Sequence, residues 1–410
     1  MPAVASSIAK ACFRRHRRPL LSIGGSTSFQ IGVSRTALSP LWFGSNIFRG
    51  SGSSTAVKTM STTRSDSNDT KPIALFLNCT RLDYDRKLDF GGLAEITDFR
   101  RNDVDAVISS SPDSSIDDEI VKLVDEVHSG TEILILKEML LPATAVERLP
   151  DSIKLICEAG TGYNNIPIDA CRARNIDVCN IPTYSTDAVA QTAITYVMNF
   201  AMNVFQQQAM LQNNDRSNFN GPFTLPLMEL NGKTLGLVGG SGRIGTKVAE
   251  IALVLGMKIV ISSRNPCLHE SHALYGNPSV RVTSDVDEVL RDSDFVSLHT
   301  PLNAATEGTF GRAQISKMKP TAYLVNTSRG KVCNEDELIE CLKEGMIAGA
   351  GLDVTATEPP SADSELWGLP NAWLSPHIGW RRLETRQRLV DMTVDNVKAY
   401  MDTEIINKVN

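Results

Sequence analysis

A glycine-rich loop between an apolar strand pattern and a helical pattern constrains this chain more than any other feature. Residues 233–238 (KTLGLV) have the composition of a short buried strand, and residues 239–245 (GGSGRIG) follow directly. A helical pattern and a second apolar strand pattern come next, so Gly240, Gly242 and Gly245 have the GxGxxG spacing in the right context. Such a loop binds the phosphates of a dinucleotide on the N–H groups at the start of its helix, and we expect a dinucleotide-binding domain here.

The end of the second strand of this unit indicates which dinucleotide is preferred. Residues 258–262 (KIVIS) are followed by Ser263 and Arg264, at the place where an NAD enzyme usually has an acidic residue. An acid repels a 2′-phosphate, whereas a hydroxyl and a guanidinium both bind it. We therefore predict that NADP(H) is preferred, with NAD(H) as the alternative.

The rest of the chain after residue 71 alternates between strand and helix patterns. Residues 73–77, 132–136 and 152–157 have the apolar runs of buried strands, whereas 116–127 and 186–208 have helical spacing. Alternation of this kind is typical of a parallel sheet with helices on both faces, so the sequence predicts an α/β fold.

Charge divides the chain into two parts. It has 41 Lys plus Arg and 47 Asp plus Glu, a net charge of −6, but residues 1–65 contain nine basic residues and no acid, which leaves −15 for the remainder. An Arg-rich, Ser-rich and acid-free leader is typical of an organelle transit peptide. We expect residues 1–70 to be a disordered leader that directs the protein to the mitochondrion, with a plastid, or a cytosolic form started at Met60, as alternatives.

Composition also argues against several classes of protein. The acidic body makes nucleic acid an unfavourable partner, and the sequence contains no apolar stretch long enough to predict a membrane span. Eight cysteines are present without a CxxC pair or a His cluster at ligand spacing, so we expect reduced thiols and no metal site. A small-molecule substrate is the better expectation.

Three segments late in the chain supply reactive side chains at strand ends or in loops. Arg329 lies in NTSRG, Glu358 in DVTATEPP and His377 in SPHIG. Reduction of a 2-keto acid needs a cation for the carboxylate, a proton donor for the carbonyl oxygen, and a carboxylate that keeps the donor charged. The three residues match these requirements.

With the glycine loop, these motifs occur in an order that resembles the D-isomer-specific 2-hydroxyacid dehydrogenase family over residues 73–400. The stretches YSTDAVAQ (184–191) and EPPSAD (358–363) look most similar to the glycerate dehydrogenase, or hydroxypyruvate reductase, branch. By this resemblance Arg329 binds the substrate carboxylate, His377 protonates the carbonyl oxygen, and Glu358 holds His377 as imidazolium.

The resemblance also implies binding residues. Backbone N–H groups of Thr161 and Gly162 are expected to bind the substrate carboxylate together with Arg329. The segment 137–141 is expected to edge the substrate pocket, although it lacks the family's usual Pro-Leu pair. By the resemblance, the positions that match the family's cofactor contacts are Arg243, Ile244, Pro301, Thr306, Thr327, Ser328 and Asp353. Together with Gly240, Gly242 and Gly245 of the glycine loop and with Ser263 and Arg264, they are the expected cofactor-binding residues.

The resemblance further implies two doubly wound, Rossmann- or flavodoxin-like domains with the active site in a cleft between them. Residues 71–182 plus 378–410 are expected to form the substrate domain and 183–377 the dinucleotide-binding domain, in a homodimer. The leading prediction is an NAD(P)H-dependent reductase of hydroxypyruvate or glyoxylate. A D-lactate or other D-2-hydroxyacid dehydrogenase is the main alternative, and an NAD(H)-binding corepressor-like regulator is a further one.

Overall fold

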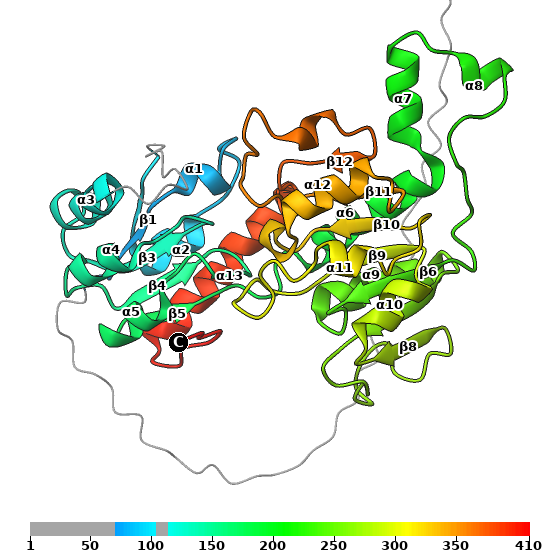
Figure 1. Ribbon diagram of the computed structural model, residues 1–410. Coiled ribbons are helices and arrows are strands. Elements are labelled where there is room, and N and C mark those ends of the chain that lie inside the picture. Colours follow the sequence, from blue (N-terminus) through cyan, green and yellow to red (C-terminus); the bar gives the residue numbers. More distant parts are fainter. Residues whose placement is uncertain (1–69, 104–113) are drawn as a thin grey trace, which may run out of the picture. The chain divides into compact units, whose positions relative to one another are not determined.

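The computed structural model describes residues 70–103 and 114–410, which form two parallel sheets with helices on both faces (Figure 1). The leader predicted at residues 1–70 lies outside the described residues except for Thr70, and its organelle address stays a prediction.

The first sheet has five strands in the order β2-β1-β3-β4-β5, all parallel. Its strands are β1 (Ile73–Phe76), β2 (Asp98–Arg101), β3 (Thr131–Leu136), β4 (Leu155–Glu158) and β5 (Asp177–Cys179). The helices of this part are α1 (Cys79–Leu82), α2 (Gly91–Ile96), α3 (Ser114–Lys122) continued by the π-helix η1 (Leu123–Val127), α4 (Ala143–Arg148), α5 (Ile168–Ala173) and the long C-terminal α13 (Leu383–Met401).

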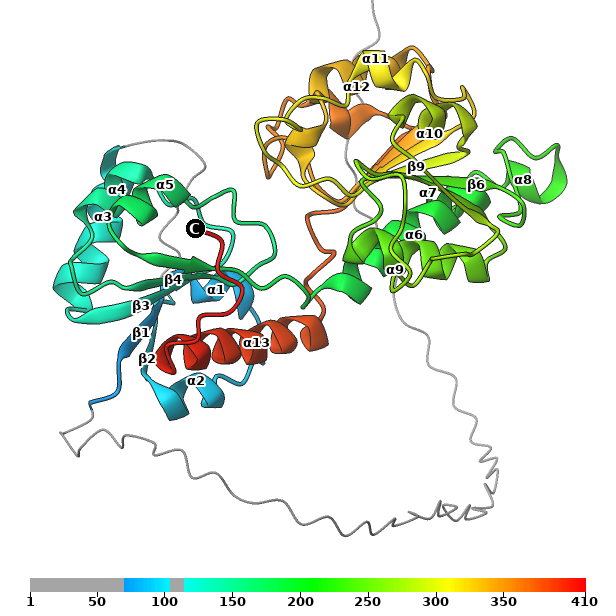
Figure 2. The ribbon, with the colours of Figure 1, turned by 90° about the horizontal axis from the view of Figure 1, so that it is seen from below.

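Alternation along the central strands of this sheet determines which helices cover each face. Ala74 and Phe76 point into a core shared with α1, α2 and α13, whereas Leu75 and Leu77 pack with α3, α4 and α5. Figure 2 shows α13 running along the face of the first sheet that α2 also covers, next to α2. The last helix of the chain therefore packs on the first sheet.

The second sheet has seven parallel strands in the order β12-β11-β10-β9-β6-β7-β8. They are β6 (Thr234–Val238), β7 (Lys258–Ser262), β8 (Val280–Thr283), β9 (Phe295–Leu298), β10 (Tyr323–Asn326), β11 (Gly349–Leu352) and β12 (Ala372–Leu374). The helices are α6 (Thr186–Met202), α7 (Val204–Gln212), α8 (Ser217–Asn220), α9 (Arg243–Val254), α10 (Val286–Asp292), α11 (Arg312–Ile315), η2 (Gly330–Val332), α12 (Glu335–Lys343) and η3 (Glu365–Gly368).

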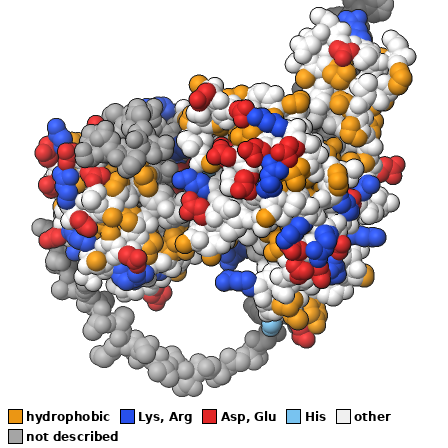
Figure 3. Space-filling view, viewed as in Figure 1, with side chains coloured by type: hydrophobic (Ala, Val, Ile, Leu, Met, Phe, Trp, Pro, Cys, Tyr) orange, Lys and Arg blue, Asp and Glu red, His pale blue; other side chains and the backbone are white. Residues whose placement is uncertain are grey.

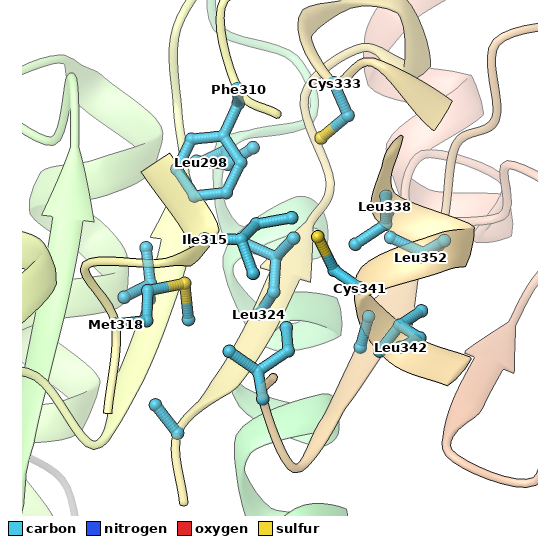
Figure 4. Packing of buried hydrophobic residues seen from close by; sticks show 14 of the residues in the cluster. Leu298, Phe310, Ile315, Met318, Leu324, Cys333, Leu338, Cys341, Leu342 and Leu352 are labelled. Carbon is cyan, nitrogen blue, oxygen red and sulfur yellow. The ribbon is translucent and has the colours of Figure 1, made fainter. Parts of the chain in front are cut away.

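Two apolar cores hold these helices against the second sheet. One packs α6 and α9 on one face, and the other packs α10, α11 and α12 on the opposite face. Figure 4 shows part of the second core, where Ile315 of α11 and Cys341 of α12 lie on either side of Leu324 of β10. Strand order reverses at β6, and in open α/β sheets ligands bind at the carboxyl ends of the strands near such a point.

Two local boundaries differ from the sequence prediction. The helix expected over 186–208 breaks at Asn203, whose φ of 49° is left-handed, because the Asn199 side chain accepts the N–H of Phe205 there. The helical pattern after the glycine loop covers residues 246–255, but the helix begins at Arg243, with Gly242 as its N-cap.

The predicted fold class, two doubly wound α/β domains with parallel sheets, is confirmed. The domain boundaries at residues 182 and 377 stay predictions. Within the described ranges, no helix is long and apolar enough to cross a membrane.

Candidate active site

A pocket of about 480 Å³ lies at the carboxyl ends of strands from both sheets. Its wall includes Glu138 after β3, Gly162 after β4, Gly242 after β6, Thr327 after β10 and Asp353 after β11. The volume is in the range of small-molecule sites. The strand ends thus bring segments from distant parts of the sequence into one site.

His377 lies in the loop between β12 and α13, with its imidazole on the pocket wall and its side chain 14% exposed. The Nδ1 atom of His377 is 2.8 Å from Oε2 of Glu358, which lies in the loop after β11. A carboxylate on Nδ1 fixes the orientation of the ring. Nε2 is therefore the nitrogen that remains for a substrate.

Asp353 holds the loop that carries His377. This buried carboxylate accepts the backbone N–H groups of Ile378 and Gly379, each at 2.9 Å, and the hydroxyl of Ser375. The N–H of His377 donates to the Asp353 carbonyl at 2.9 Å. These bonds fix the backbone on both sides of His377, which has a left-handed φ of 51°.

Arg329 follows β10 and begins the short helix η2. Its guanidinium donates to the Ser328 carbonyl at 2.8 Å and to Oδ1 of Asn164 at 3.4 Å. It lies against Gly162, where an added Cβ would be 1.9 Å from Nη2 of Arg329. The absence of a side chain at residue 162 is what lets the guanidinium reach this position.

Gly162→Ala is expected to displace Arg329 without unfolding the protein, since the clash is with the end of a flexible side chain. We expect kcat/KM for the keto acid to fall by about 10- to 100-fold, the effect of weakening hydrogen bonds to a charged group. Steady-state kinetics and the thermal midpoint measure the two effects. An unchanged kcat/KM would contradict the assigned position of the guanidinium.

The turn after β4 presents backbone N–H groups next to Arg329. The Thr161 carbonyl accepts the Asn180 amide at 2.7 Å, and the Thr161 hydroxyl donates to the Ile181 carbonyl at 3.0 Å, so the turn is fixed. No acceptor for the N–H of Thr161 or Gly162 is found among the described residues. Together with the Arg329 guanidinium, these two N–H groups form a binding site suited to a carboxylate.

The glycine loop has the geometry that a pyrophosphate needs. An added Cβ on Gly245 would be 2.5 Å from the Gly240 Cα, so the first and third glycines pack directly together. A Cβ on Gly242 would meet nothing within 4 Å, and this residue faces the pocket. Gly239 has a φ of 75°, which explains the additional glycine.

Three polar atoms on the same side of the pocket are buried without a partner. Nε2 of His299, Oγ1 of Thr300 and Oγ1 of Thr327 find no hydrogen bond in the part of the chain that the structure describes. Burial lowers the pKa of His299 to about 4, so its ring is neutral at neutral pH. Such atoms, beside an open glycine loop, fit a bound dinucleotide that supplies donors and acceptors.

The pocket contains most of the predicted site residues. Those on its wall are Arg329 and His377, Thr161 and Gly162, and Gly242, Arg243, Ile244, Gly245, Pro301, Thr327, Ser328 and Asp353. Glu358 reaches the pocket through His377. Gly240 lies in the loop and packs against Gly245. Ser263 lies beside the loop, with its hydroxyl oxygen 3.2 Å from that of Ser241. Arg264 is exposed, and Thr306 bonds within its own loop to the Pro301 carbonyl.

The segment 137–141 was expected to edge the substrate pocket, and Lys137 and Glu138 of this segment lie on the pocket wall. Tyr184 and Trp380 line the same wall and were not predicted as site residues. The Lys137 ammonium lies 4.1 Å from the centre of the Trp380 ring. The charged character of this wall was readable from the sequence, but the ring contact was not.

Behind this side lies Glu158, a fully buried carboxylate. Its oxygens accept the N–H of Glu138 at 3.0 Å and the Asn165 amide at 2.8 Å. Burial raises the pKa of Glu158 from about 4.5 to about 7, although Lys137 and Asn165 act to lower it. The folded state therefore binds a proton at Glu158 more tightly than the unfolded chain does.

This pKa predicts a pH dependence of stability. The stabilisation from protonated Glu158 is fully present below pH 4.5 and is lost as the pH rises through about 7. Glu158→Gln removes this titration. We therefore expect the difference in thermal midpoint, wild type minus variant, to decrease as the pH is raised from 5 to 8. The exposed Glu147→Gln is the matched control. A pH-independent difference for Glu158→Gln would contradict the raised pKa.

Comparison with known proteins agrees with this fold. The sequence model for the NAD-binding domain of D-isomer-specific 2-hydroxyacid dehydrogenases matches residues 194–379. The chain is 36% identical over 274 residues to a hydroxypyruvate reductase from Blautia hydrogenotrophica, covering 66% of this chain and 82% of that protein. It is 36% identical over 287 residues to a glyoxylate reductase from Thermococcus litoralis, covering 69% and 84%.

Solved structures show the same architecture. An NADPH-dependent glyoxylate/hydroxypyruvate reductase from Sinorhizobium meliloti, in complex with NADP and malonate, is similar with a TM-score of 0.66 and 26% identity, covering 83% of this chain and 97% of that one. An acyclic imino acid reductase in complex with NADPH and D-Arg has a TM-score of 0.69 at 26% identity, covering 83% and 100%. The chain belongs to the D-isomer-specific 2-hydroxyacid dehydrogenase family. It is an oxidoreductase with a nicotinamide-dinucleotide domain.

Proposed function

We propose that the protein reduces a small 2-keto acid, hydroxypyruvate or glyoxylate, to the D-2-hydroxy acid, with NADPH as the preferred cofactor. The observation that carries the proposal is the 2.8 Å contact between His377 Nδ1 and Glu358, in one pocket with Arg329. Relatives named hydroxypyruvate reductase and glyoxylate reductase support the substrate class.

The chemistry follows from the side chains. Arg329 and the N–H groups of Thr161 and Gly162 bind the substrate carboxylate, which orients the carbonyl. A dinucleotide held at the glycine loop would supply the hydride for the carbonyl carbon. His377 donates the proton on Nε2 to the carbonyl oxygen, and Glu358 stabilises the imidazolium that makes this donation. Burial of the imidazole strengthens both interactions by excluding water.

The cofactor preference is supported by the end of β7. Ser263 lies beside the glycine loop and Arg264 follows it, exposed and able to bind a 2′-phosphate. A similar structure from Sinorhizobium meliloti is described as NADPH-dependent.

A panel of substrates tests the proposal. Hydroxypyruvate, glyoxylate, pyruvate and phenylpyruvate are each assayed with NADPH and with NADH by absorbance. We expect the highest kcat/KM with hydroxypyruvate or glyoxylate and NADPH. A preference for pyruvate would favour the D-lactate dehydrogenase alternative, a preference for NADH would refute the cofactor assignment, and absence of turnover would favour a regulator.

We also propose a homodimer formed through the dinucleotide-binding domain. Exposed apolar side chains gather on α7, α8 and the following loop, including Phe205, Phe219 and Phe223. Figure 3 shows orange patches on the extension that α7 and α8 form. Exposed patches of this kind mark protein contacts. Sedimentation equilibrium is expected to give twice the chain mass, and a monomer at micromolar concentration would contradict the dimer.

A further inference from the structure

Glu138 is a charged residue on the pocket wall that the proposed chemistry does not use. It follows β3 and has a left-handed φ of 54°, a conformation that non-glycine residues rarely adopt. Its N–H is held by the buried Glu158 at 3.0 Å. Strained backbone is retained where the surroundings fix it, and it often occurs at functional positions.

Two cationic side chains and the His377 imidazole surround the Glu138 carboxylate. Oε1 is 2.8 Å from the Lys137 ammonium and 3.7 Å from Nε2 of His377, and Oε2 is 3.0 Å from the Arg81 guanidinium. Burial acts to raise the pKa of Glu138, but Lys137, His377 and Arg81 together hold it well below its usual range. The carboxylate is therefore ionised, and it accepts hydrogen bonds but donates none.

The position of Glu138 relative to His377 determines what part of a substrate it meets. A carbonyl oxygen protonated by Nε2 must lie within about 3 Å of that nitrogen. The Glu138 carboxylate lies near the same nitrogen, 3.7 Å from Nε2. Its negative charge repels the substrate carboxylate, which Arg329 and the Thr161–Gly162 turn attract. The substituent on the other side of the carbonyl carbon is then the group that faces Glu138.

We propose that Glu138 is a specificity-determining residue that selects 2-keto acids with a hydroxyl group on the carbon next to the carbonyl. This inference rests on the proposed function and narrows it to hydroxypyruvate. The substrate hydroxyl donates a hydrogen bond to the carboxylate, whereas the methyl group of pyruvate and the hydrogen of glyoxylate cannot. A polar group built to bind a substrate hydroxyl rejects analogues without it, because its own hydrogen bond is then lost on binding.

Glu138→Gln tests the inference with little change in shape. We expect the ratio of kcat/KM for hydroxypyruvate to kcat/KM for pyruvate to fall by about 5- to 10-fold, because the neutral amide oxygen is a weaker acceptor than the carboxylate. Glu147→Gln, an exposed change on α4, is the matched control and should leave the ratio unchanged. The double variant Lys137→Met/Glu138→Leu removes the buried pair together, and NADPH binding measured by fluorescence shows that each variant is folded.

The outcomes separate the two proposals. A ratio that stays within twofold in both variants overturns the inference, while the wild-type activity still supports the proposed function. An equal loss of kcat on every keto acid also overturns it, because Glu138 would then act through His377 and not on the substrate hydroxyl. A wild-type protein that reduces none of the keto acids contradicts the proposed function and the inference together.

Discussion

His377→Ala is expected to lower kcat by about 10²- to 10⁴-fold, the range for loss of a general acid. The His377 imidazole lies on the pocket wall. Glu358 holds its Nδ1 atom at 2.8 Å, and its Nε2 atom faces the pocket. Alanine leaves no proton donor there. Steady-state turnover with hydroxypyruvate and NADPH measures the effect.

His128→Ala is a matched control, since His128 lies at the end of η1 and outside the pocket wall. Its turnover should equal that of the wild type. NADPH binding by His377→Ala should also be close to normal, which separates loss of chemistry from loss of the fold. Near-normal turnover of His377→Ala would refute its assignment as the acid.

Arg329→Lys is expected to lower kcat/KM by about 10- to 1000-fold, because an ammonium cannot make the paired hydrogen bonds of a planar guanidinium. The shape of the site amplifies the effect, since Gly162 and the Asn164 amide are fitted to the guanidinium. Both KM and kcat should change, because the same group binds the carboxylate and orients the carbonyl.

Lys331→Arg, a charge-conserving change of an exposed residue two positions further on, is the control for Arg329→Lys. It should leave the kinetics unchanged. Unaltered KM and kcat in Arg329→Lys would count against the carboxylate role. The same comparison with pyruvate shows whether the loss is common to all 2-keto acids, as binding of the shared carboxylate requires.

The sequence predicted those parts of the site that depend on local spacing. The three glycines of the loop lie within six residues, so their spacing alone specified a turn in which Gly240 and Gly245 touch. Arg329, Glu358 and His377 were predicted from the chemistry that they supply together and from their order along the chain. Their contact then depends on strand ends that a parallel sheet places at one edge.

Other features depend on contacts between distant segments and were not predictable in this way. Glu138 faces His377 because the end of β3 and the loop before α13 meet at the pocket, and both residues have a left-handed φ. The break at Asn203 has a local origin instead, since the N–H of Phe205 donates to the Asn199 side chain and this one bond outweighs a continuous helical pattern. Asp353 was expected near the cofactor, and the structure adds that its carboxylate holds the His377 loop.

The stereochemical outcome of one turnover tests the central claim most directly. The protein is incubated with hydroxypyruvate and NADPH carrying deuterium at the transferable C4 position, and the product is examined by chiral chromatography and mass spectrometry. We predict D-glycerate with one deuterium at C2. L-glycerate, or a product without deuterium, would contradict the assignment of the site as a D-2-hydroxyacid dehydrogenase active site.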